Sequence, residues 1–297
     1  YDANGNIQTL NRNKNTENGT NRMDELTYAY KTDKPNQLQR VDDAVTIATN
    51  AEDIKDQTTV ENYIYNSIGQ LIENKDEQVK YAYNASGLVT EVQKNGTPRV
   101  RFYYNDRGHR MKKESILPSG TTTTYYVRDA AGTPMAIYEN SILTEQPIYG
   151  SSRLGVHYRQ TNSDVYQLTD HLGNVRAVIM KNGENAVSLT AKTDYYPFGM
   201  PMPNRNIEGN YRYKFQGQEK DSETGKEAFE LRLWDGRIGR WLTVDPMGEF
   251  FSPYLGMGNN PISNIDPDGG CVKCDQNAAN GSTYIDESGA SWTKGAD

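Results

Sequence analysis

The sequence is poor in cysteine and contains no long apolar run. Among 297 residues the only cysteines are Cys271 and Cys274, both near the C-terminal end. The body of the fold therefore cannot depend on disulfide bonds, and the cysteine content neither selects nor excludes a cellular compartment. No segment approaches the roughly 18 to 20 apolar residues of a transmembrane helix, and none resembles the core of a signal peptide. We expect no membrane span in this sequence.

Basic residues are also in deficit. Lys and Arg total 32 against 39 Asp and Glu, a formal net charge of −7. This balance argues against nucleic acid as the main partner, because binding to phosphates requires a basic surface.

The residues for a metal or cofactor site are scarce. Cys271 and Cys274 have the spacing of half a zinc site, but no second pair follows them, and all three histidines lie far upstream. No glycine-rich phosphate loop follows a strand pattern. The sequence therefore predicts no metal and no cofactor, and the two cysteines are interpreted as a free or disulfide-bonded dithiol.

Tyrosine and glycine are abundant. The chain has 21 Tyr against 6 Phe, with 26 Gly. Tyrosine suits a strand in which its ring packs while its hydroxyl reaches water. This composition predicts an all-β protein rich in turns.

A short motif repeats with a period near 20 residues. It consists of an aromatic residue, Asn or Asp, two arbitrary residues and Gly. Asn or Asp favours a type I turn, and the Gly tolerates the positive φ that closes a hairpin with a bulge. Two strands with their connections need about 20 residues, so each repeat predicts one β-hairpin. The copies are Tyr65–Gly69, Tyr83–Gly87 and Tyr104–Gly108, with looser ones at Asp129–Gly132 and Asp170–Gly173.

The regular spacing favours a stacked or spiralling sheet over the unrelated hairpins of an ordinary sandwich. Two polar stretches, Asn11–Arg22 and Thr49–Thr59, are predicted to be surface loops or insertions between repeat strands. Tyr195–Pro203 contains three prolines and cannot be a central strand, so it marks the start of a specialised C-terminal part. Because Tyr1–Ile7 resembles the middle of a repeat, we treat the chain as a fragment of a longer polypeptide.

The repeats resemble the YD repeats of the RHS family, and Thr169–Gly269 resembles the RHS repeat-associated core domain. The motifs that carry this resemblance are Asp170–Arg176 (DHLGNVR), Tyr195–Gly199 (YYPFG), Trp234–Pro246 (WDGRIGRWLTVDP) and Gly258–Gly269 (GNNPISNIDPDG). The resemblance divides the chain into repeat hairpins at 1–168, a core domain at 169–269 and the start of a variable payload region at 270–297.

The resemblance implies a specific architecture and a set of partners. Family members include the C component of insecticidal toxin complexes, bacterial RHS polymorphic toxins and, more distantly, teneurins. A spiralling β-sheet forms a hollow shell, the core domain plugs one end, and a C-terminal payload, often a toxin, is held inside. The implied partners are the payload itself, a secretion or delivery machinery and an immunity protein for the payload. The implied location is secreted or on the surface of a bacterial cell.

Two Asp-Pro-x-Gly sequences carry the candidate chemistry. Asp245–Gly248 and Asp266–Gly269 are separated by 17 residues, and Pro followed by Gly predicts a turn that presents the Asp side chain. If the two carboxyl groups meet, mutual repulsion keeps one protonated. The pair can then act as a base toward water and as an acid toward a leaving amide. The alternative is that both aspartates are ordinary turn residues.

The resemblance assigns roles to these residues. The family's catalytic carboxylates map onto Asp245 and Asp266, and its arginine, 13 residues before the first aspartate, maps onto Arg232. A guanidinium there would orient a carboxylate or stabilise charge on the scissile carbonyl. The alternative is a structural ion pair, and Arg237 and Arg240 are close enough in sequence to compete for the role.

The implied reaction is an aspartyl-type self-cleavage just after residue 269, within Gly269, Gly270, Cys271 and Val272. The chain departs from the family pattern in two ways. One residue is missing between the turns, and Gly270 follows where self-cleaving members carry a bulky apolar residue, so a pocket for that side chain is expected to be empty. The alternative function is a non-catalytic secreted or cell-surface structural or adhesive YD-repeat protein. Carboxylates more than about 8 Å apart would reject the pair.

Overall fold

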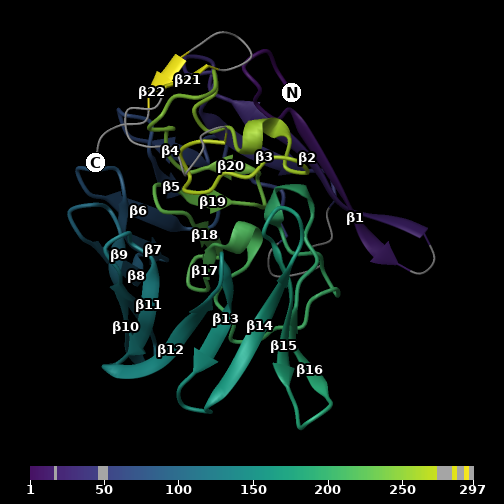
Figure 1. Ribbon diagram of the computed structural model, residues 1–297. Coiled ribbons are helices and arrows are strands. Elements are labelled where there is room, and N and C mark those ends of the chain that lie inside the picture. The colour runs from purple at the N-terminus through teal and green to yellow at the C-terminus, as the bar shows by residue number, and fades with distance from the viewer. Residues whose placement is uncertain (17–18, 46–52, 273–282, 286–290, 294–297) are drawn as a thin grey trace.

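The protein is built almost entirely from antiparallel β-strands. The computed structural model describes residues 1–16, 19–45, 53–272, 283–285 and 291–293 (Figure 1). The helical elements of this part are three 3-10 turns, η1 (Pro197–Gly199), η2 (Phe215–Gly217) and η3 (Met257–Asn259). Within the same residues no helix is long and apolar enough to cross a membrane.

A sheet of 13 strands dominates the fold. Its strands are β4 (Tyr63–Tyr65), β5 (Leu71–Asn74), β6 (Val79–Tyr83), β7 (Val89–Lys94), β8 (Thr97–Tyr104), β9 (Arg110–Leu117), β10 (Gly120–Arg128), β11 (Pro134–Glu139), β12 (Ile142–Tyr149), β13 (Arg153–Tyr158), β14 (Ser163–Thr169), β15 (Val175–Lys181) and β16 (Val187–Lys192). Each strand pairs with its neighbour in the chain. The prediction of an all-β ladder of consecutive hairpins is confirmed.

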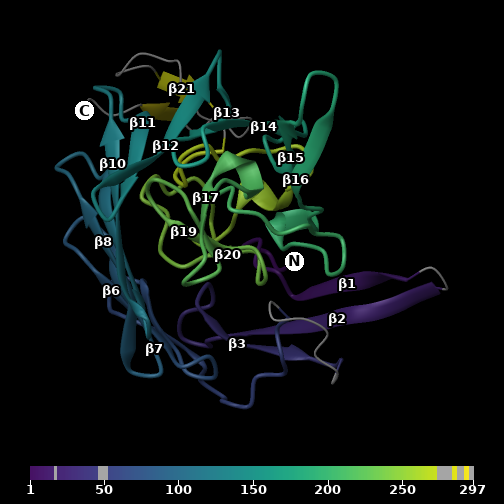
Figure 2. The same ribbon diagram turned by 90° about the horizontal axis from the view of Figure 1, so that it is seen from below.

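Three smaller sheets complete the fold. They comprise β1 (Thr9–Thr16), β2 (Gly19–Tyr30) and β3 (Leu38–Asp43); β17 (Glu219–Asp221), β18 (Lys226–Ala228), β19 (Leu233–Asp235) and β20 (Arg240–Trp241); and β21 (Thr283–Ile285) with β22 (Ser291–Thr293). Seen from below, the large sheet bends around the C-terminal segment that carries β17 to β20 (Figure 2).

The repeat motif forms the turn that its residues predict. At Asn84–Gly87 the Gly87 amide donates to the Asn84 carbonyl at 3.1 Å, and Gly87 has a φ of +84°. The pairing register shifts by one residue at Tyr83, which is the predicted bulge. The same hydrogen bond and positive φ recur at Asn66–Gly69, Asn105–Gly108, Asp129–Gly132 and Asp170–Gly173.

The motif tyrosines connect successive hairpins. Tyr83 donates its hydroxyl hydrogen to the Leu71 carbonyl at 2.6 Å, and Tyr104 donates to the Val89 carbonyl at 2.8 Å. These two hydroxyls thus have backbone partners within the sheet. The hydroxyl satisfies a backbone carbonyl of the preceding hairpin while its ring packs against the core.

The main core lies between the concave face of the sheet and the C-terminal segment. Val100 and Phe102 on β8 belong to the same buried cluster as Trp234 and Trp241. The two indole rings pack edge to face with centroids 4.9 Å apart. The C-terminal segment is thereby held in place by apolar contacts with the sheet.

Two segment predictions need correction. Asn11–Arg22 is not a surface loop: described residues of this stretch lie in β1 and β2, which pair from Thr9–Thr27 to Thr16–Gly19. Figure 2 shows this hairpin extending away from the body. The far ends of β1 and β2 therefore have no core to pack against, and their sequence lacks the apolar alternation of a half-buried strand. In the second stretch, residues 53–59 form no regular element but bury Ile54 and Gln57, and residues 49–52 lie outside the described part.

The proline-rich segment behaves as predicted. The last strand of the large sheet ends at Lys192, and Tyr195–Pro203 contains only η1 and an isolated bridge from Tyr195 to Pro201. The hairpin ladder thus continues past residue 169, where the sequence resemblance places the start of the core domain.

Two motif glycines, Gly69 and Gly87, form a matched pair for measuring how tightly the C-terminal segment packs against the repeat turns. Gly69 and Gly87 have φ values of +86° and +84°, so alanine at either position costs about 1–2 kcal/mol of backbone strain. A Cβ on Gly69 would lie 2.6 Å from Val244 Cγ2, whereas the nearest atom at Gly87 is Gln70 Nε2 at 3.3 Å. We expect Gly69→Ala to lose about 1–3 kcal/mol more stability than Gly87→Ala in denaturant unfolding. Equal losses would contradict the packing of Val244 on this turn.

Candidate functional site

The Asp245 turn holds its own aspartate by hydrogen bonds. Asp245 Oδ1 accepts from the Met247 amide at 3.0 Å, and Oδ2 accepts from the Glu249 amide at 3.2 Å. Gly248 supplies a φ of +64°. The Asp245 amide also donates to the Pro253 carbonyl at 2.9 Å, which fixes the turn to the following loop.

The Asp266 turn has a similar construction. Asp266 Oδ1 accepts from the Gly269 amide at 2.8 Å and from the Gly270 amide at 3.1 Å. Gly269 has a φ of +86°, and a Cβ there would lie 2.9 Å from the Phe229 Cβ, so this position requires glycine. Asp266 Oδ2 is left facing away from the turn, toward Arg232.

Arg232 brings the two turns together. It directly precedes β19, and its Nη2 lies 3.5 Å from Asp245 Oδ1 and 3.6 Å from Asp266 Oδ2. Because both oxygens are this close to one nitrogen, they cannot be more than about 7 Å apart, inside the limit of about 8 Å set above. The guanidinium carbon lies 4.3 Å from the centre of the Trp241 ring, a stacking contact that fixes its orientation.

All three charged groups are buried. Asp266 is 1% exposed, Arg232 5% and Asp245 7%. Burial raises the pKa of Asp266 to about 6; Arg232 opposes this shift, while Asp268 and Asp245 add to it. Burial likewise lowers the pKa of Arg232, and the two carboxylates oppose that shift. A carboxyl group that titrates near neutral pH therefore lies beside a second carboxylate.

Neither competing arginine contacts this pair. Arg237 pairs with Asp235 at 2.9 Å and with Glu77 at 2.6 Å. Arg240 donates to the Tyr30 hydroxyl at 3.0 Å and to the Asn36 carbonyl at 2.7 Å. Among the three arginines, the structure places only Arg232 between the aspartates.

The segment named as the cleavage region lies in the site. Arg232 Nε donates to the Gly269 carbonyl oxygen, while the Gly270 amide donates to Asp266 and, at 2.9 Å, to Asp268 Oδ1. The Val272 amide donates to Glu249 Oε2 at 2.9 Å. The Gly269–Gly270 peptide is thus held at both its oxygen and its nitrogen.

The expected empty pocket at residue 270 is absent from the described structure. A Cβ on Gly270 would lie 2.7 Å from Leu231 Cδ1 and 3.5 Å from Met247 Cγ. Leu231 therefore occupies the space that a bulky residue at 270 would need. Cys271, the next residue, is buried and disulfide-bonded, which decides between the two states predicted for this thiol; Cys274 lies outside the described residues.

Sequence reasoning missed Gln216. Its Oε1 accepts from the Asp266 amide at 3.0 Å, and its own amide donates to Asn174 Oδ1 at 2.8 Å. Gln216 is buried at a positive φ of 48° inside η2. It connects the Asp266 turn to the repeat turn at Asp170–Asn174, and no spacing rule in the sequence connects residues 50 positions apart.

The three charged side chains of the site lie inside the protein. The cavity lined by Arg232, Leu233 and Thr243 holds only about 10 Å³. The Gly269–Gly270 backbone, which is part of the chain itself, contacts Arg232 and Asp266 in this buried setting.

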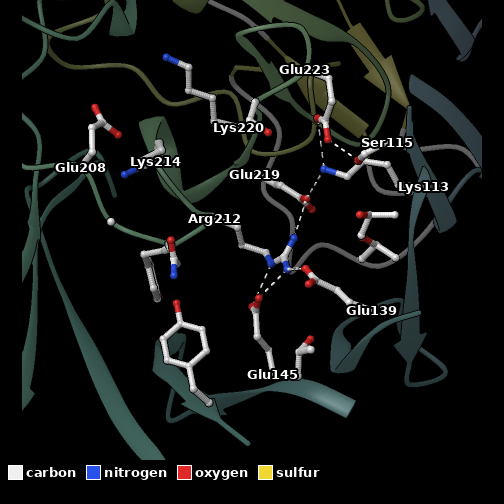
Figure 3. Close-up of a pocket in the computed structure, with 18 of the residues that line it drawn as sticks. Lys113, Ser115, Glu139, Glu145, Glu208, Arg212, Lys214, Glu219, Lys220 and Glu223 are labelled. Atoms are coloured by element: carbon white, nitrogen blue, oxygen red, sulfur yellow. Dashed lines mark hydrogen bonds and ion pairs between the residues drawn. The ribbon is translucent and has the colours of Figure 1, made fainter. Parts of the chain in front are cut away.

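A much larger cavity lies elsewhere. It encloses about 830 Å³ between strands β9 to β13 and residues 193–225, and none of Arg232, Asp245 and Asp266 lines it. Its charged side chains mostly pair with one another (Figure 3): Arg212 contacts Glu145 and lies 3.0 Å from Glu219, and Lys113 lies 3.4 Å from Glu219. We interpret this network as a structural link between the sheet and the C-terminal segment.

Comparisons with known proteins agree with this architecture. The family model described as Teneurin YD-shell matches residues 1–254. Salivary gland surface protein 1 of Aedes aegypti is 32% identical over 240 residues, 75% of this chain and 7% of that protein. The tRNA nuclease WapA of Bacillus subtilis strain 168 is 26% identical over 233 residues, 70% of this chain and 10% of that protein. Toxin subunit YenC2 of Yersinia entomophaga is 34% identical over 82 residues, 26% of this chain and 8% of that subunit.

Solved structures show the same fold. The Photorhabdus luminescens Tc holotoxin pore carrying a TccC3 mutation aligns with a TM-score of 0.59 at 17% identity, over 88% of this chain and 14% of that one. The TcdB2-TccC3 complex without its hypervariable C-terminal region aligns with a TM-score of 0.55 at 18% identity, over 84% of this chain and 13% of that one. The chain spans 7 to 10% of the length of the curated relatives named above. From the match over residues 1–254 and the hairpin ladder, the chain belongs to the teneurin YD-shell family.

Proposed function

We propose that this chain forms part of a shell that encloses a C-terminal payload, and that Asp245, Asp266 and Arg232 cleave the chain after Gly269. One observation carries the proposal for cleavage. The Gly269–Gly270 peptide lies with its oxygen on Arg232 and its nitrogen on Asp266. Both atoms whose charge changes during hydrolysis are therefore already in contact with groups that can stabilise the change.

The proposed roles follow from these contacts. Arg232 stabilises the negative charge that develops on the Gly269 carbonyl oxygen. Asp245 accepts a proton from the water that attacks the Gly269 carbonyl carbon. Asp266, protonated, donates its proton to the Gly270 nitrogen as the peptide bond breaks. The products are a carboxylate at Gly269 and an amine at Gly270.

The burial of the site supports self-cleavage over cleavage of another protein. Asp266 is 1% exposed, Arg232 5% and Asp245 7%. A substrate that is already part of the chain avoids the entropic cost of bringing a second peptide into this space.

The pH dependence tests the role of Asp266. Its folded pKa of about 6 lies above the ordinary value of 3.8, so the acid form predominates below pH 6 and is lost as the pH rises. We expect the first-order rate of cleavage to fall up to about tenfold per pH unit above pH 6. The rate can be followed by intact mass after a jump from pH 9 to values between 5 and 8. A rate that rises through this range would contradict the acid role.

The shell and its partners form the second part of the proposal. The chain shares its fold with a chain of the Tc holotoxin pore, and its curated relatives include toxin subunits and a tRNA nuclease. We take the partners to be the enclosed payload, a secretion or delivery machinery and an immunity protein, with the protein secreted or displayed on a bacterial surface. Expression of the complete gene product should yield a payload that co-purifies with the shell after cleavage. A cleaved payload that separates freely in gel filtration would contradict enclosure.

A further inference from the structure

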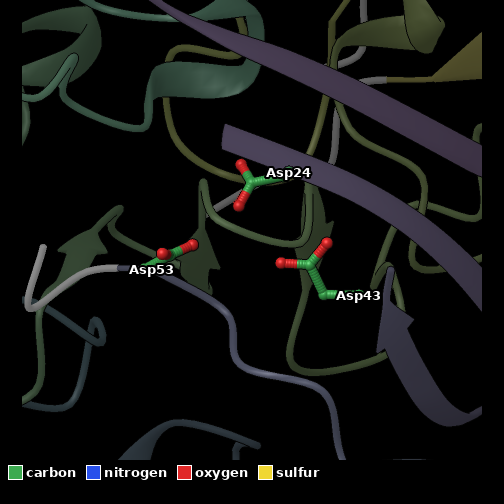
Figure 4. Close-up of side chains that lie close together, drawn as sticks. All are labelled: Asp24, Asp43 and Asp53. Carbon is green, nitrogen blue, oxygen red and sulfur yellow. The ribbon is translucent and has the colours of Figure 1, made fainter. Parts of the chain in front are cut away.

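The carboxyl groups of three buried aspartates lie close together. All three residues are far in sequence from the candidate cleavage site. Asp24 lies on β2, Asp43 ends β3, and Asp53 lies in the irregular segment that follows (Figure 4). Each offers a carboxylate oxygen, and these oxygens all lie within 4.8 Å of one another. The three residues are 0%, 4% and 8% exposed.

The described contacts of Asp24 and Asp43 bring one positive charge, Arg12, to this cluster. Arg12 Nε lies 2.6 Å from Asp24 Oδ2, and the remaining nitrogens of Arg12 donate to Met200 Sδ and to the Arg237 carbonyl. Asp43 Oδ1 accepts from the Glu25 and Val45 amides at 2.9 and 3.0 Å. Arg12 is thus paired with Asp24, and keeping three buried carboxyl groups this close together is costly because like charges repel.

Asp24 gives a second, independent sign of a ligand. Its side chain is fully buried, and Oδ1 accepts no hydrogen bond from any described residue. In Figure 4 its carboxylate points toward Asp43 and Asp53, whose facing atoms are also oxygens. Buried oxygens nearly always find a donor or a cation, so Asp24 Oδ1 is available to bind a cation.

We propose that Asp24, Asp43 and Asp53 bind a calcium ion. Calcium takes carboxylate oxygens at about 2.3–2.6 Å, so two oxygens up to about 4.8 Å apart can bind the same ion. Magnesium is the poorer candidate because it gives up its water reluctantly, and a buried site requires dehydration. Soft metals prefer sulfur or imidazole ligands, which this set lacks.

The ion would connect parts of the fold that are distant in sequence. Its ligands come from β2, β3 and the segment after β3. Arg12, the second contact of Asp24, reaches the C-terminal segment through Met200 and Arg237. Calcium would thus stabilise the contact between the β1–β3 sheet and the segment that carries Asp245 and Asp266. This inference does not depend on cleavage.

A proton is the competing occupant. With no cation, burial and the neighbouring carboxylates raise the pKa of Asp24 to about 7, although Arg12 opposes the shift. A shared proton and a calcium ion make opposite predictions: the protonated cluster loses stability as the pH rises through 7, whereas calcium binds better once the carboxyl groups are ionised.

The test measures thermal unfolding of the full 297-residue chain at pH 8, with 1 mM EDTA or increasing CaCl2. Calcium at about 100 times its Kd should raise the Tm by about 5 °C. Terbium, a calcium probe, should give tyrosine-sensitised luminescence that excess calcium removes. Asp24→Asn and Asp43→Asn should abolish both responses. Asp42→Asn is the matched control, because Asp42 lies on the same strand, is partly exposed and pairs with Arg40 at 2.9 Å.

Two results would overturn the proposal. One is a wild-type chain whose Tm and terbium signal do not respond to calcium at pH 8. If the Tm of that chain also increases on acidification to pH 6, the cluster holds a shared proton. The other is a calcium response that persists in Asp24→Asn. Because the terbium measurement uses the wild-type chain, the test remains decisive even if an aspartate variant fails to fold.

Discussion

Replacing Asp266 by Asn should stop the release of residues 270–297. Asparagine keeps an Oδ1 that accepts from the Gly269 and Gly270 amides, as Asp266 does at 2.8 and 3.1 Å, so the turn is preserved. It removes the proton that the Gly270 nitrogen needs, and loss of a general acid costs about 10²–10⁴-fold in rate. With a tag after Asp297, the wild-type chain should yield a small C-terminal fragment that the variant does not.

Asp245→Asn should have an effect of the same size, because it removes the proposed base. Asp268→Asn is the matched control: Asp268 lies in the same turn and also accepts from the Gly270 amide, at 2.9 Å, but it has no proposed catalytic role and should leave cleavage within a few-fold of wild type. Wild-type protein that remains intact over days would reject the self-cleavage proposal. The aspartates would then be turn residues, as in the non-catalytic alternative.

The proposed site was predictable where its residues belong to recognisable turns. Asp-Pro-x-Gly specifies a turn from local chemistry alone, and both turns form with their aspartates as internal acceptors. The resemblance supplied the choice of Arg232, since spacing alone left Arg237 and Arg240 equally available. The ion pairs of Arg237 with Glu77 and Asp235, and the hydrogen bond from Arg240 to the Asn36 carbonyl, depend on tertiary contacts that the sequence does not reveal.

Other parts were not predictable because long-range packing determines them. The far ends of β1 and β2 carry polar residues on both faces, so the apolar alternation that reveals a half-buried strand is missing from this sequence. The space beside Gly270 is filled by Leu231, whose position depends on the backbone bond from the Leu231 amide to the Asp268 carbonyl at 2.9 Å. The aspartate cluster has no motif spacing, because its members come from two strands and a connecting segment.

The link between the large sheet and the C-terminal segment depends on buried charge, and Asp221→Asn should weaken it strongly. Asp221 is fully buried at the end of β17 and accepts from Arg110 on β9 at 2.9 and 3.1 Å; Lys113 lies 3.3 Å away. Removing its charge leaves the buried Arg110 guanidinium without a counter-ion. Breaking one side of such a pair costs about 3–5 kcal/mol, so we expect a Tm lower by about 10 °C.

Two comparisons identify burial as the cause. Glu91→Gln breaks a pair with Arg101 at 2.6 Å whose arginine is 42% exposed, and it should lower the Tm far less than Asp221→Asn because solvent screens an exposed pair. The double variant Arg110→Met with Asp221→Leu should be more stable than Asp221→Asn, because it removes both members of the buried Arg110–Asp221 pair. If the double variant is no more stable than the single one, the Asp221–Arg110 contact acts through shape and not through charge. In either case a weakened link should slow cleavage, since the segment from Arg232 to Gly269 depends on the sheet for its position.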